Sequence, residues 1–374
     1  MNIEIGECKS MVPTTDSPCT HYIPVANGSA GLCKVPTKFR CTQAIKELAM
    51  RLSHSTIQDY MKCKRLYWLK HVNGVVMKEE NISSAMKAGS LMDLVWEMVY
   101  NEAIFDRDKV ATIKSVEGKD VHVYEKDTLS HCHRDIINGY IYDVNVPATV
   151  VSKVWGIYRA YKEYITPCLD GFVGTQKHFE LHLRQKDIKD VLIHGYYDVL
   201  FEDHFEEYKF TGQPEDYSRP IQIGSQVGTY FLANPALEYV DMMIVHSPQL
   251  KLLRANKKRA DDETDSEYEE RIYLDAVSRP SHYFKGFNRK TGTFGRRFYR
   301  SEFDLREIER RYIQIAIEIK RRTEENAWYK EDYFNCSSFN SSCEYMPVCE
   351  SDDGSGRVNV SEEIFEIREK VLDR

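Results

Sequence analysis

The sequence predicts an α+β fold in which helices flank a central mixed, mostly antiparallel sheet. Two segments rich in β-branched and aromatic residues, 191–201 and 204–210, are separated only by a short polar stretch, as in a β-hairpin. Segments with helical periodicity lie on both sides of this pair. The chain has 374 residues, and its hydrophobic content of 42% and aromatic content of 12% allow a substantial core.

Further elements are expected on both sides of the hairpin. The first helix is expected to start with a capping box of Ser55 and Gln58. The acidic run from Asp261 to Glu270 follows three basic residues and is typical of a mobile charged loop. The remaining expected elements are helices near 55–72, 84–103, 150–166 and 303–325, a helix around Gln226, strands at 176–184 and 239–245, and a helical tail over 351–374.

The hairpin carries two acids and a lysine at spacings that bring them together. A two-residue turn at 202–203 pairs residue 198 with residue 207, and directly paired residues face the same side of a sheet. Side chains alternate along a strand, so Lys209 shares the face of Glu207. Asp198, Glu207 and Lys209 are therefore expected to form one patch.

Adjacent carboxylates repel each other unless a cation lies between them. Mg²⁺ suits this role because it prefers oxygen ligands and is often held by one or two carboxylates. Such an ion activates water and stabilises charge on a phosphodiester, and a nearby lysine can orient the water. A solvent-facing hairpin with an ordinary Glu–Lys pair is the alternative from the residues alone.

The patch belongs to a longer pattern along the chain: Gly195-x-x-Asp198, Glu207-x-Lys209 and Gln226-x-x-x-Tyr230. In order and spacing this pattern resembles the PD-(D/E)XK nucleases and, more closely, their RecB-like branch. The resemblance implies a restriction-endonuclease-like core in which Asp198 and Glu207 bind Mg²⁺ or Mn²⁺ and Lys209 is catalytic. It also places Gln226 and Tyr230 beside the active site, and both lie on one helix face.

The same resemblance adds two acidic residues to the expected metal site. Glu180 lies on the strand before the hairpin, where RecB-like enzymes often carry a glutamate. The run from Ala88 to Asp93 is similar to the RecB-like Gly-Ser/Thr-x-x-His helix start, with Asp93 in the place of the usual histidine. Glu97, one turn further on, is a potential substitute for Asp93. A solvated helix face is the alternative for both of these helical acids.

Ten cysteines predict metal or redox chemistry, because the composition favours a reducing compartment. Cys63 precedes the carboxylate hairpin, and Cys336, Cys343 and Cys349 follow it in a polar loop. Four thiolates suit either an iron–sulfur cluster or zinc, and the nesting around the hairpin favours the cluster. Reduced structural thiols are the alternative.

This nesting resembles the [4Fe–4S] staple of AddB-type and CRISPR-associated RecB-like nucleases. The resemblance implies a cluster-closed nuclease domain over residues 49–350. Two features depart from the family pattern: the first C-terminal gap has six residues where two is common, and Lys64 stands where proline is frequent.

The sequence predicts that residues 1–48 form a cysteine-rich, loop-rich extension. A small segment without a large core often needs a metal staple. A zinc site at Cys19, Cys33 and Cys41 is one expectation, and scattered free cysteines in a flexible extension are the other.

The net charge of −7 does not indicate nucleic-acid binding, but residues 285–300 are locally basic. Six Lys and Arg residues and four aromatic residues share this stretch, and none of its residues is acidic. The expected hairpin either grips phosphates and stacks bases or is a solvated basic turn whose aromatic rings belong to the core.

These features together predict a divalent-metal-dependent DNA nuclease. By resemblance it is an exonuclease acting on DNA ends or single strands in recombination, repair or viral DNA processing, with recombination or helicase proteins as partners. The alternatives are a catalytically inactive DNA-binding or assembly module that keeps the fold and the cluster, and a zinc-stapled protein-interaction factor. Neither a signal peptide nor a membrane span is expected, which favours the cytoplasm of a bacterium or of a virus-infected cell.

Overall fold

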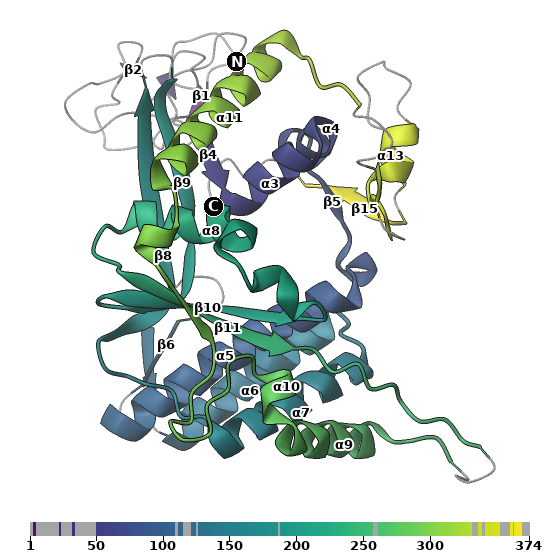
Figure 1. Cartoon of the computed structure of the whole chain (residues 1–374). Coiled ribbons are helices and arrows are strands. Elements are labelled where there is room, and N and C mark those ends of the chain that lie inside the picture. The colour runs from purple at the N-terminus through teal and green to yellow at the C-terminus, as the bar shows by residue number, and fades with distance from the viewer. Residues whose placement is uncertain are drawn as a thin grey trace. The chain divides into compact units, whose positions relative to one another are not determined.

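The structure is a computed structural model that divides into two compact units. One comprises residues 1–52 and 182–193, and the other, larger unit comprises residues 53–181 and 194–374. Figure 1 draws the whole chain, coloured by residue number. The residues described are 50–108, 111–114, 121–124, 126–185, 188–256, 261–330, 336–338, 341–351, 360–361 and 363–368, with the short strands at 3–4, 22–23 and 32–33.

A mixed sheet forms the centre of the larger unit. Its strands lie in the order β12-β11-β10-β9, with β8 also against β9. β10 pairs with β11 in parallel, whereas the pairs β9–β10 and β11–β12 are antiparallel. β8 and β9 continue into the smaller unit, where β4 (Met50–Ser53) joins the sheet as its sixth strand. The larger-unit strands are β8 (Phe172–Gln185), β9 (Ile188–Phe201), β10 (His204–Thr211), β11 (Tyr239–His246) and β12 (Arg296–Tyr299).

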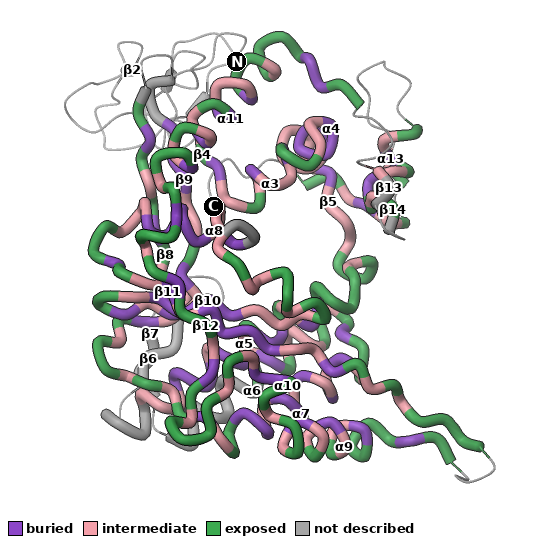
Figure 2. Tube along the Cα trace, viewed as in Figure 1, coloured by how far each residue is buried: buried purple, intermediate pink, exposed green. Residues whose placement is uncertain are grey.

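Helices cover both faces of this sheet, so the predicted α+β class is confirmed. One hydrophobic cluster joins the sheet to α5 (Ser84–Asp108), α6 (Lys126–Asp143), α7 (Ala148–Tyr164) and α9 (Asp265–Ser278). A second cluster on the other face includes α8 (Pro220–Ala233) and the start of α11 (Leu305–Glu325). Buried residues accordingly follow the strands and the inner sides of these helices (Figure 2).

The expected helix over 55–72 is interrupted at Cys63. α3 (His54–Lys62) ends there because Cys63 adopts an extended conformation, with φ −162° and ψ 123°. α4 (Lys64–Tyr67) and a π-helix, η2 (Trp68–Val72), follow.

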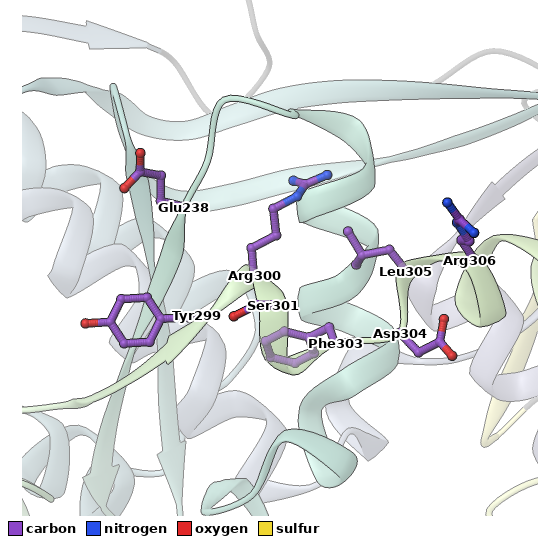
Figure 3. A pocket seen from close by; sticks show the side chains of 8 residues that line it. All are labelled: Glu238, Tyr299, Arg300, Ser301, Phe303, Asp304, Leu305 and Arg306. Carbon is purple, nitrogen blue, oxygen red and sulfur yellow. The ribbon is translucent and has the colours of Figure 1, made fainter.

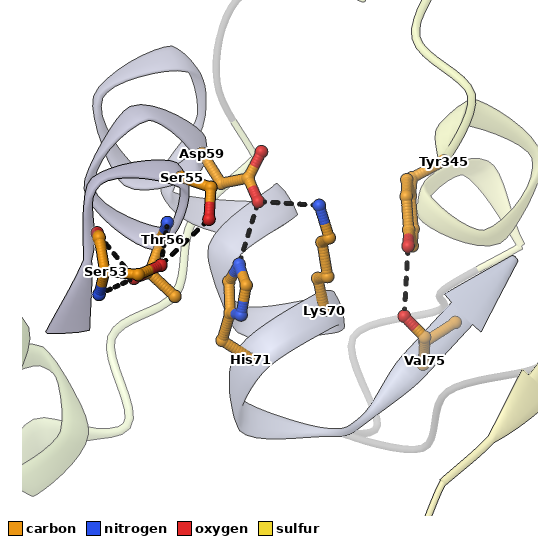
Figure 4. Close-up of polar contacts among 8 residues, drawn as sticks. All are labelled: Ser53, Ser55, Thr56, Asp59, Lys70, His71, Val75 and Tyr345. Atoms are coloured by element: carbon orange, nitrogen blue, oxygen red, sulfur yellow. Dashed lines mark hydrogen bonds and ion pairs between the residues drawn. The ribbon is translucent and has the colours of Figure 1, made fainter. Parts of the chain in front are cut away.

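The capping box of α3 also differs from the predicted one, because Ser53 and Thr56 form it instead of Ser55 and Gln58 (Figure 4). The π-helix is tied back to α3, since Lys70 and His71 both contact the Asp59 carboxylate at 2.8 Å (Figure 4).

Two regions that were expected to lack helices contain them. The segment between α5 and α7 holds a short hairpin, β6 (Ala111–Lys114) with β7 (Val121–Tyr124), and then α6. The predicted mobile loop is wrong from Asp265 onward, because its acidic residues form the first turns of α9. Thr264 and Glu267 make a reciprocal capping box there, and acidic residues are favourable at a helix N-terminus.

The remaining expected helices and strands of the larger unit are found at their predicted places, except in the tail. Within the expected helical tail, residues Phe365–Ile367 form β15, which pairs with β5 (Val75–Met77). Among the helices of the described part of the chain, none combines the length and the apolar character that a bilayer crossing requires.

The smaller unit contains a three-stranded sheet of β1 (Ile3–Glu4), β3 (Leu32–Cys33) and β2 (Tyr22–Ile23), in that order. Cys19 and Cys41 lie outside the described residues, as does the side chain of Cys33. The zinc site proposed for them and the boundary at residue 48 stay predictions.

Two helical glycines allow a test of how closely α7 and α9 approach. A Cβ atom on Gly156 would lie 2.7 Å from Ile272 Cγ2 and 2.9 Å from the Glu269 carbonyl oxygen, whereas one on Gly139 would meet nothing within 4 Å. We expect Gly156→Ala to lower the free energy of unfolding by about 1–3 kcal/mol through overpacking. Gly139→Ala, the matched control, should raise it by roughly 0.5–1 kcal/mol through helix propensity. Urea unfolding measures both, and equal effects would contradict the close approach.

Candidate active site

Glu207 on β10 is the most buried acid of the candidate site, with 1% of its surface exposed. Its Oε1 atom accepts hydrogen bonds from Lys209 Nζ at 2.5 Å and from Gln226 Nε2 at 2.7 Å. Gln226 Nε2 also lies 3.0 Å from the hydroxyl of Tyr230, one turn further along α8. The structure thus joins four of the predicted site residues in one continuous network.

Asp198 reaches this network where β9 and β10 separate. The predicted register holds for the pairs Phe205–Leu200 and Glu206–Val199, but the ladder then ends and the expected backbone pair of residues 198 and 207 is not formed. Instead, the backbone N–H of Tyr208 donates to Asp198 Oδ2 at 2.9 Å. The Asp198 side chain therefore replaces a strand partner at this point.

A small cavity lies beside Asp198. Its lining includes Asp93 and Glu97 of α5 and Gln176 of β8. Gln176 has a φ angle of 46°, a backbone conformation that non-glycine residues seldom adopt and that often occurs at functional sites. Nothing in the sequence pattern singled out Gln176.

Glu180 was expected to assist the metal ligands, but the structure does not bring it to this cavity. It lies exposed on β8, four residues beyond Gln176, and the cavity lining does not include it. Gln176, on the same strand, lines the cavity where Glu180 was expected.

Mutual repulsion and lost hydration shift the pKa values of the acids upward. Burial and then Glu207 raise the pKa of Asp198 well above its usual range, Lys209 opposes this shift, and Asp93 adds to it. Asp93 is exposed as a residue, yet loss of water around its carboxyl group raises its pKa to about 6, with Lys209 opposing and Glu207 adding. The three carboxylates and the lysine therefore lie near one another.

The lysine responds in the opposite sense to the same neighbours. Burial alone would lower the pKa of Lys209, but Glu207 and Asp198 raise it above its usual value. Lys209 consequently remains a fixed positive charge at neutral pH, next to Glu207.

One atom of the site fits a bound cation. Glu207 Oε2 is buried and accepts no hydrogen bond from any residue that the structure describes. A buried carboxylate oxygen without a donor is costly unless a cation or water satisfies it. Carboxylate oxygens of Glu207, Asp198 and Asp93 are the ligand type that Mg²⁺ and Mn²⁺ prefer. Across the described ranges, however, no three His, Cys, Asp or Glu side chains already form a group close enough to hold an ion.

Comparison with models of known protein families shows the family to which the chain belongs. The family model of the PD-(D/E)XK nuclease superfamily matches residues 51–350. The chain belongs to the PD-(D/E)XK nuclease superfamily. The match covers every residue of the network around Glu207. A search among curated proteins found none that matches.

The four cysteines of the predicted cluster site lie on separate segments of this superfamily member. Cys336 and Cys343 flank a short hairpin of β13 (Ser337–Ser338) and β14 (Ser341–Ser342), and the N–H of Cys343 donates to the carbonyl of Cys336 at 2.7 Å. The unusual six-residue gap is therefore the hairpin itself. Cys349 lies on α13 (Met346–Glu350), and all four of these cysteines are free thiols.

The described thiols influence one another electrostatically. Burial and then the charges of Cys343 and Cys63 raise the pKa of Cys336. Burial also raises the pKa of Cys349, with Lys330 and Arg65 opposing and with Cys63 and Cys336 adding. Across the described residues, however, these cysteines form no group close enough to hold a metal ion, so the ligand set stays a prediction.

The basic stretch 285–300 forms a turn and then β12, and most of its rings face the core. Phe294 and Phe298 are buried and cannot stack on bases, and Phe287 packs against the first cluster, whereas Tyr299 is exposed. Arg297 forms an ion pair with Asp241 at 2.8 Å. The alternative in which the aromatic residues belong to the core is therefore correct for the three phenylalanine rings.

A second pocket shares no residue with the carboxylate site. It surrounds the connection from β12 to α11 and includes Tyr299, Arg300 and Leu305 (Figure 3). Arg300 turns from there toward the end of α8, where its Nη1 donates to the carbonyl oxygen of Phe231 at 2.5 Å. The pocket is thus a product of helix packing rather than part of the candidate site.

The raised pKa of Asp198 predicts how its substitution affects stability. A carboxyl whose pKa is higher in the folded state destabilises that state as pH rises above its unfolded value, near 4. We expect Asp198→Asn to raise the melting temperature of the metal-free protein at pH 8 and to change it little at pH 4. The control is Asp170→Asn, at an exposed loop position. If Asp198→Asn is destabilising at pH 8, the carboxylates do not repel each other as described.

Proposed function

We propose that this chain is a divalent-metal-dependent DNA nuclease that acts on DNA ends or single strands. The observation that carries the proposal is the buried Glu207 carboxylate, with one oxygen bonded to Lys209 and Gln226 and the other without a donor among the described residues. Membership of the PD-(D/E)XK superfamily supports the reaction class. An exonuclease role in recombination, repair or viral DNA processing, with recombination or helicase proteins as partners, is the finer form of this proposal.

In this proposal Asp198 and Glu207 hold Mg²⁺ or Mn²⁺, and Asp93 completes the set from α5. The bound ion supplies Lewis-acid stabilisation of charge on the scissile phosphate. Lys209 orients the attacking water and stabilises the negative charge that develops on the phosphate. Gln226 fixes the position of Glu207 Oε1, and Tyr230 in turn contacts Gln226.

We further propose that Cys63, Cys336, Cys343 and Cys349 hold a [4Fe–4S] cluster, as in the AddB-like branch. The mutual influence of these thiols and the hairpin that places Cys336 opposite Cys343 support this ligand set. Zinc is the alternative, because four thiolates suit both.

Substitutions in the hairpin test the nuclease proposal. Asp198→Ala and Lys209→Ala should each lower kcat on single-stranded DNA by about 10²-fold or more, because the first removes a ligand of the metal ion and the second removes positive charge beside the reacting phosphate. Asp203→Asn, in the exposed turn of the same hairpin, should stay within about threefold. The measurement is release of end-labelled nucleotides in Mg²⁺ and in Mn²⁺, with circular DNA as a substrate without ends. Equal rates for all variants, or no hydrolysis by the parent protein in either metal, would leave the DNA-binding module as the better description.

Metal analysis after anaerobic purification tests the cluster. We expect about four iron and four sulfide per chain, and loss of both in Cys343→Ser. Cys168→Ser is the control, since Cys168 is exposed and outside the set. Stoichiometric zinc without iron would assign the site to zinc, and wild-type metal content in Cys343→Ser would remove Cys343 from the ligand set.

A further inference from the structure

Arg311, a cation close to the candidate active site, forms no ion pair with any residue that the structure describes. Arg311 is half-buried on α11, and its Nε is buried but makes no hydrogen bond to any residue in the described ranges. Two other arginines of the larger unit, by contrast, are paired: Arg297 with Asp241 at 2.8 Å, and Arg271 with Glu263 at 2.7 Å. A buried donor nitrogen without an acceptor is costly, so an anion from outside the chain would stabilise Arg311 Nε.

His54 connects this arginine with the candidate catalytic lysine. Burial, and then the positive charges of Lys209 and Arg311, lower the pKa of His54 to about 4. Both cations therefore lie near one imidazole ring. The ring is neutral at physiological pH and offers a polar contact without adding a third positive charge.

Hydrogen bonds fix this region relative to α8. His54 Nε2 lies 3.0 Å from Ser225 Oγ, and Gln58 Nε2 donates to the same hydroxyl at 3.0 Å. Tyr312, the neighbour of Arg311 in sequence, donates from its hydroxyl to the Ser225 carbonyl at 2.9 Å. Ser225 directly precedes Gln226, so the same helix carries both groups.

We propose that Arg311, together with His54, Gln58 and Ser225, forms a subsite for a backbone phosphate of a nucleic-acid strand. This phosphate neighbours the one that reacts beside Lys209, so the inference rests on the proposed function. The planar guanidinium group matches phosphate oxygens, and hydroxyl, amide and imidazole groups commonly supplement such contacts. Arg311 in this subsite binds and aligns the strand and takes no part in bond cleavage.

The competing explanation is purely structural. His54, Gln58 and Ser225 satisfy one another, so they would hold α3 against α8 even without a ligand. In that case the charge of Arg311 would be irrelevant to substrate binding. A binding measurement that isolates this charge separates the two explanations.

The test compares Arg311→Gln and Arg311→Lys with Arg310→Gln. Arg310 is exposed on the same helix and loses the same charge, so it controls for overall electrostatics. Fluorescence anisotropy of a labelled single-stranded oligonucleotide, without divalent metal, gives Kd at several salt concentrations. We expect Arg311→Gln to weaken binding about tenfold and to reduce the slope of log Kd against log salt by about 0.7, as one lost phosphate contact requires. Arg310→Gln should stay within about twofold, and Arg311→Lys should keep the salt slope with weaker binding.

Steady-state kinetics of the same variants supply a second readout. Arg311→Gln should raise KM with kcat within about threefold of the parent, because a binding contact is lost and the reacting groups remain. The subsite is refuted if folded Arg311→Gln matches Arg310→Gln in Kd, salt slope and KM. Should Arg311→Gln fail to fold, Arg311→Lys with unchanged Kd and KM refutes it equally.

The subsite and the nuclease proposal can fail separately. If the parent protein hydrolyses no nucleic acid but Arg311→Gln still loses affinity and salt slope, the subsite stands and the nuclease proposal fails. If hydrolysis depends on Asp198 and Lys209 while Arg311→Gln binds like Arg310→Gln, the nuclease stands and the subsite fails.

Discussion

Two adjacent buried carboxylates on β10 connect this central strand with the elements on both faces of the sheet. Glu207 faces α8 and is bonded to Lys209 and Gln226, whereas Glu206 faces α5 and accepts hydrogen bonds from the hydroxyls of Tyr100 and Tyr208. Burial raises the pKa of Glu206 to about 7, although the two hydroxyls oppose this shift. Hydrogen bonds thus hold β10 on both faces of the sheet. Any displacement of this strand would leave a buried carboxylate without donors, which is costly.

The separation of β9 and β10 is the second constraint. Regular alternation would put Tyr197 and Val199 on one face, yet Tyr197 belongs to the cluster under α8 and Val199 to the cluster under α5. The break falls on Asp198, whose carboxylate accepts the Tyr208 N–H that a continued ladder would have paired. Where the strands separate, the Asp198 carboxylate therefore accepts a hydrogen bond that a backbone carbonyl would otherwise accept. The separation also opens space for the carboxylates between the two faces.

Sequence patterns predicted those features that depend on residues close together in the chain. Enrichment in β-branched and aromatic residues identified β9 and β10, and alternation along the strand put Lys209 beside Glu207. The family resemblance, not the spacing, placed Gln226 next to them. Contacts between segments far apart in the sequence could not be predicted from these patterns. Gln176, which has a left-handed conformation, lines the cavity, whereas Glu180, four residues further along, does not. The acidic run predicted as a loop is helical from Asp265 because Thr264 caps α9. The polar contact of His54 with Ser225 joins residues 171 positions apart, beyond any sequence periodicity.

The α3 helix connects Cys63 with the α8 side of the candidate site. It begins at His54, which contacts Ser225 of α8, and it ends where Cys63 becomes extended. Arg65, just beyond, donates to the carbonyl of Trp328 at 3.0 Å, which follows α11. One short helix therefore spans from the α8 side of the site to the thiols, and both ends meet segments distant in sequence. A ligand that ties the thiols together would fix one end of α3, and a rigid helix transmits that restraint to His54 at the other end.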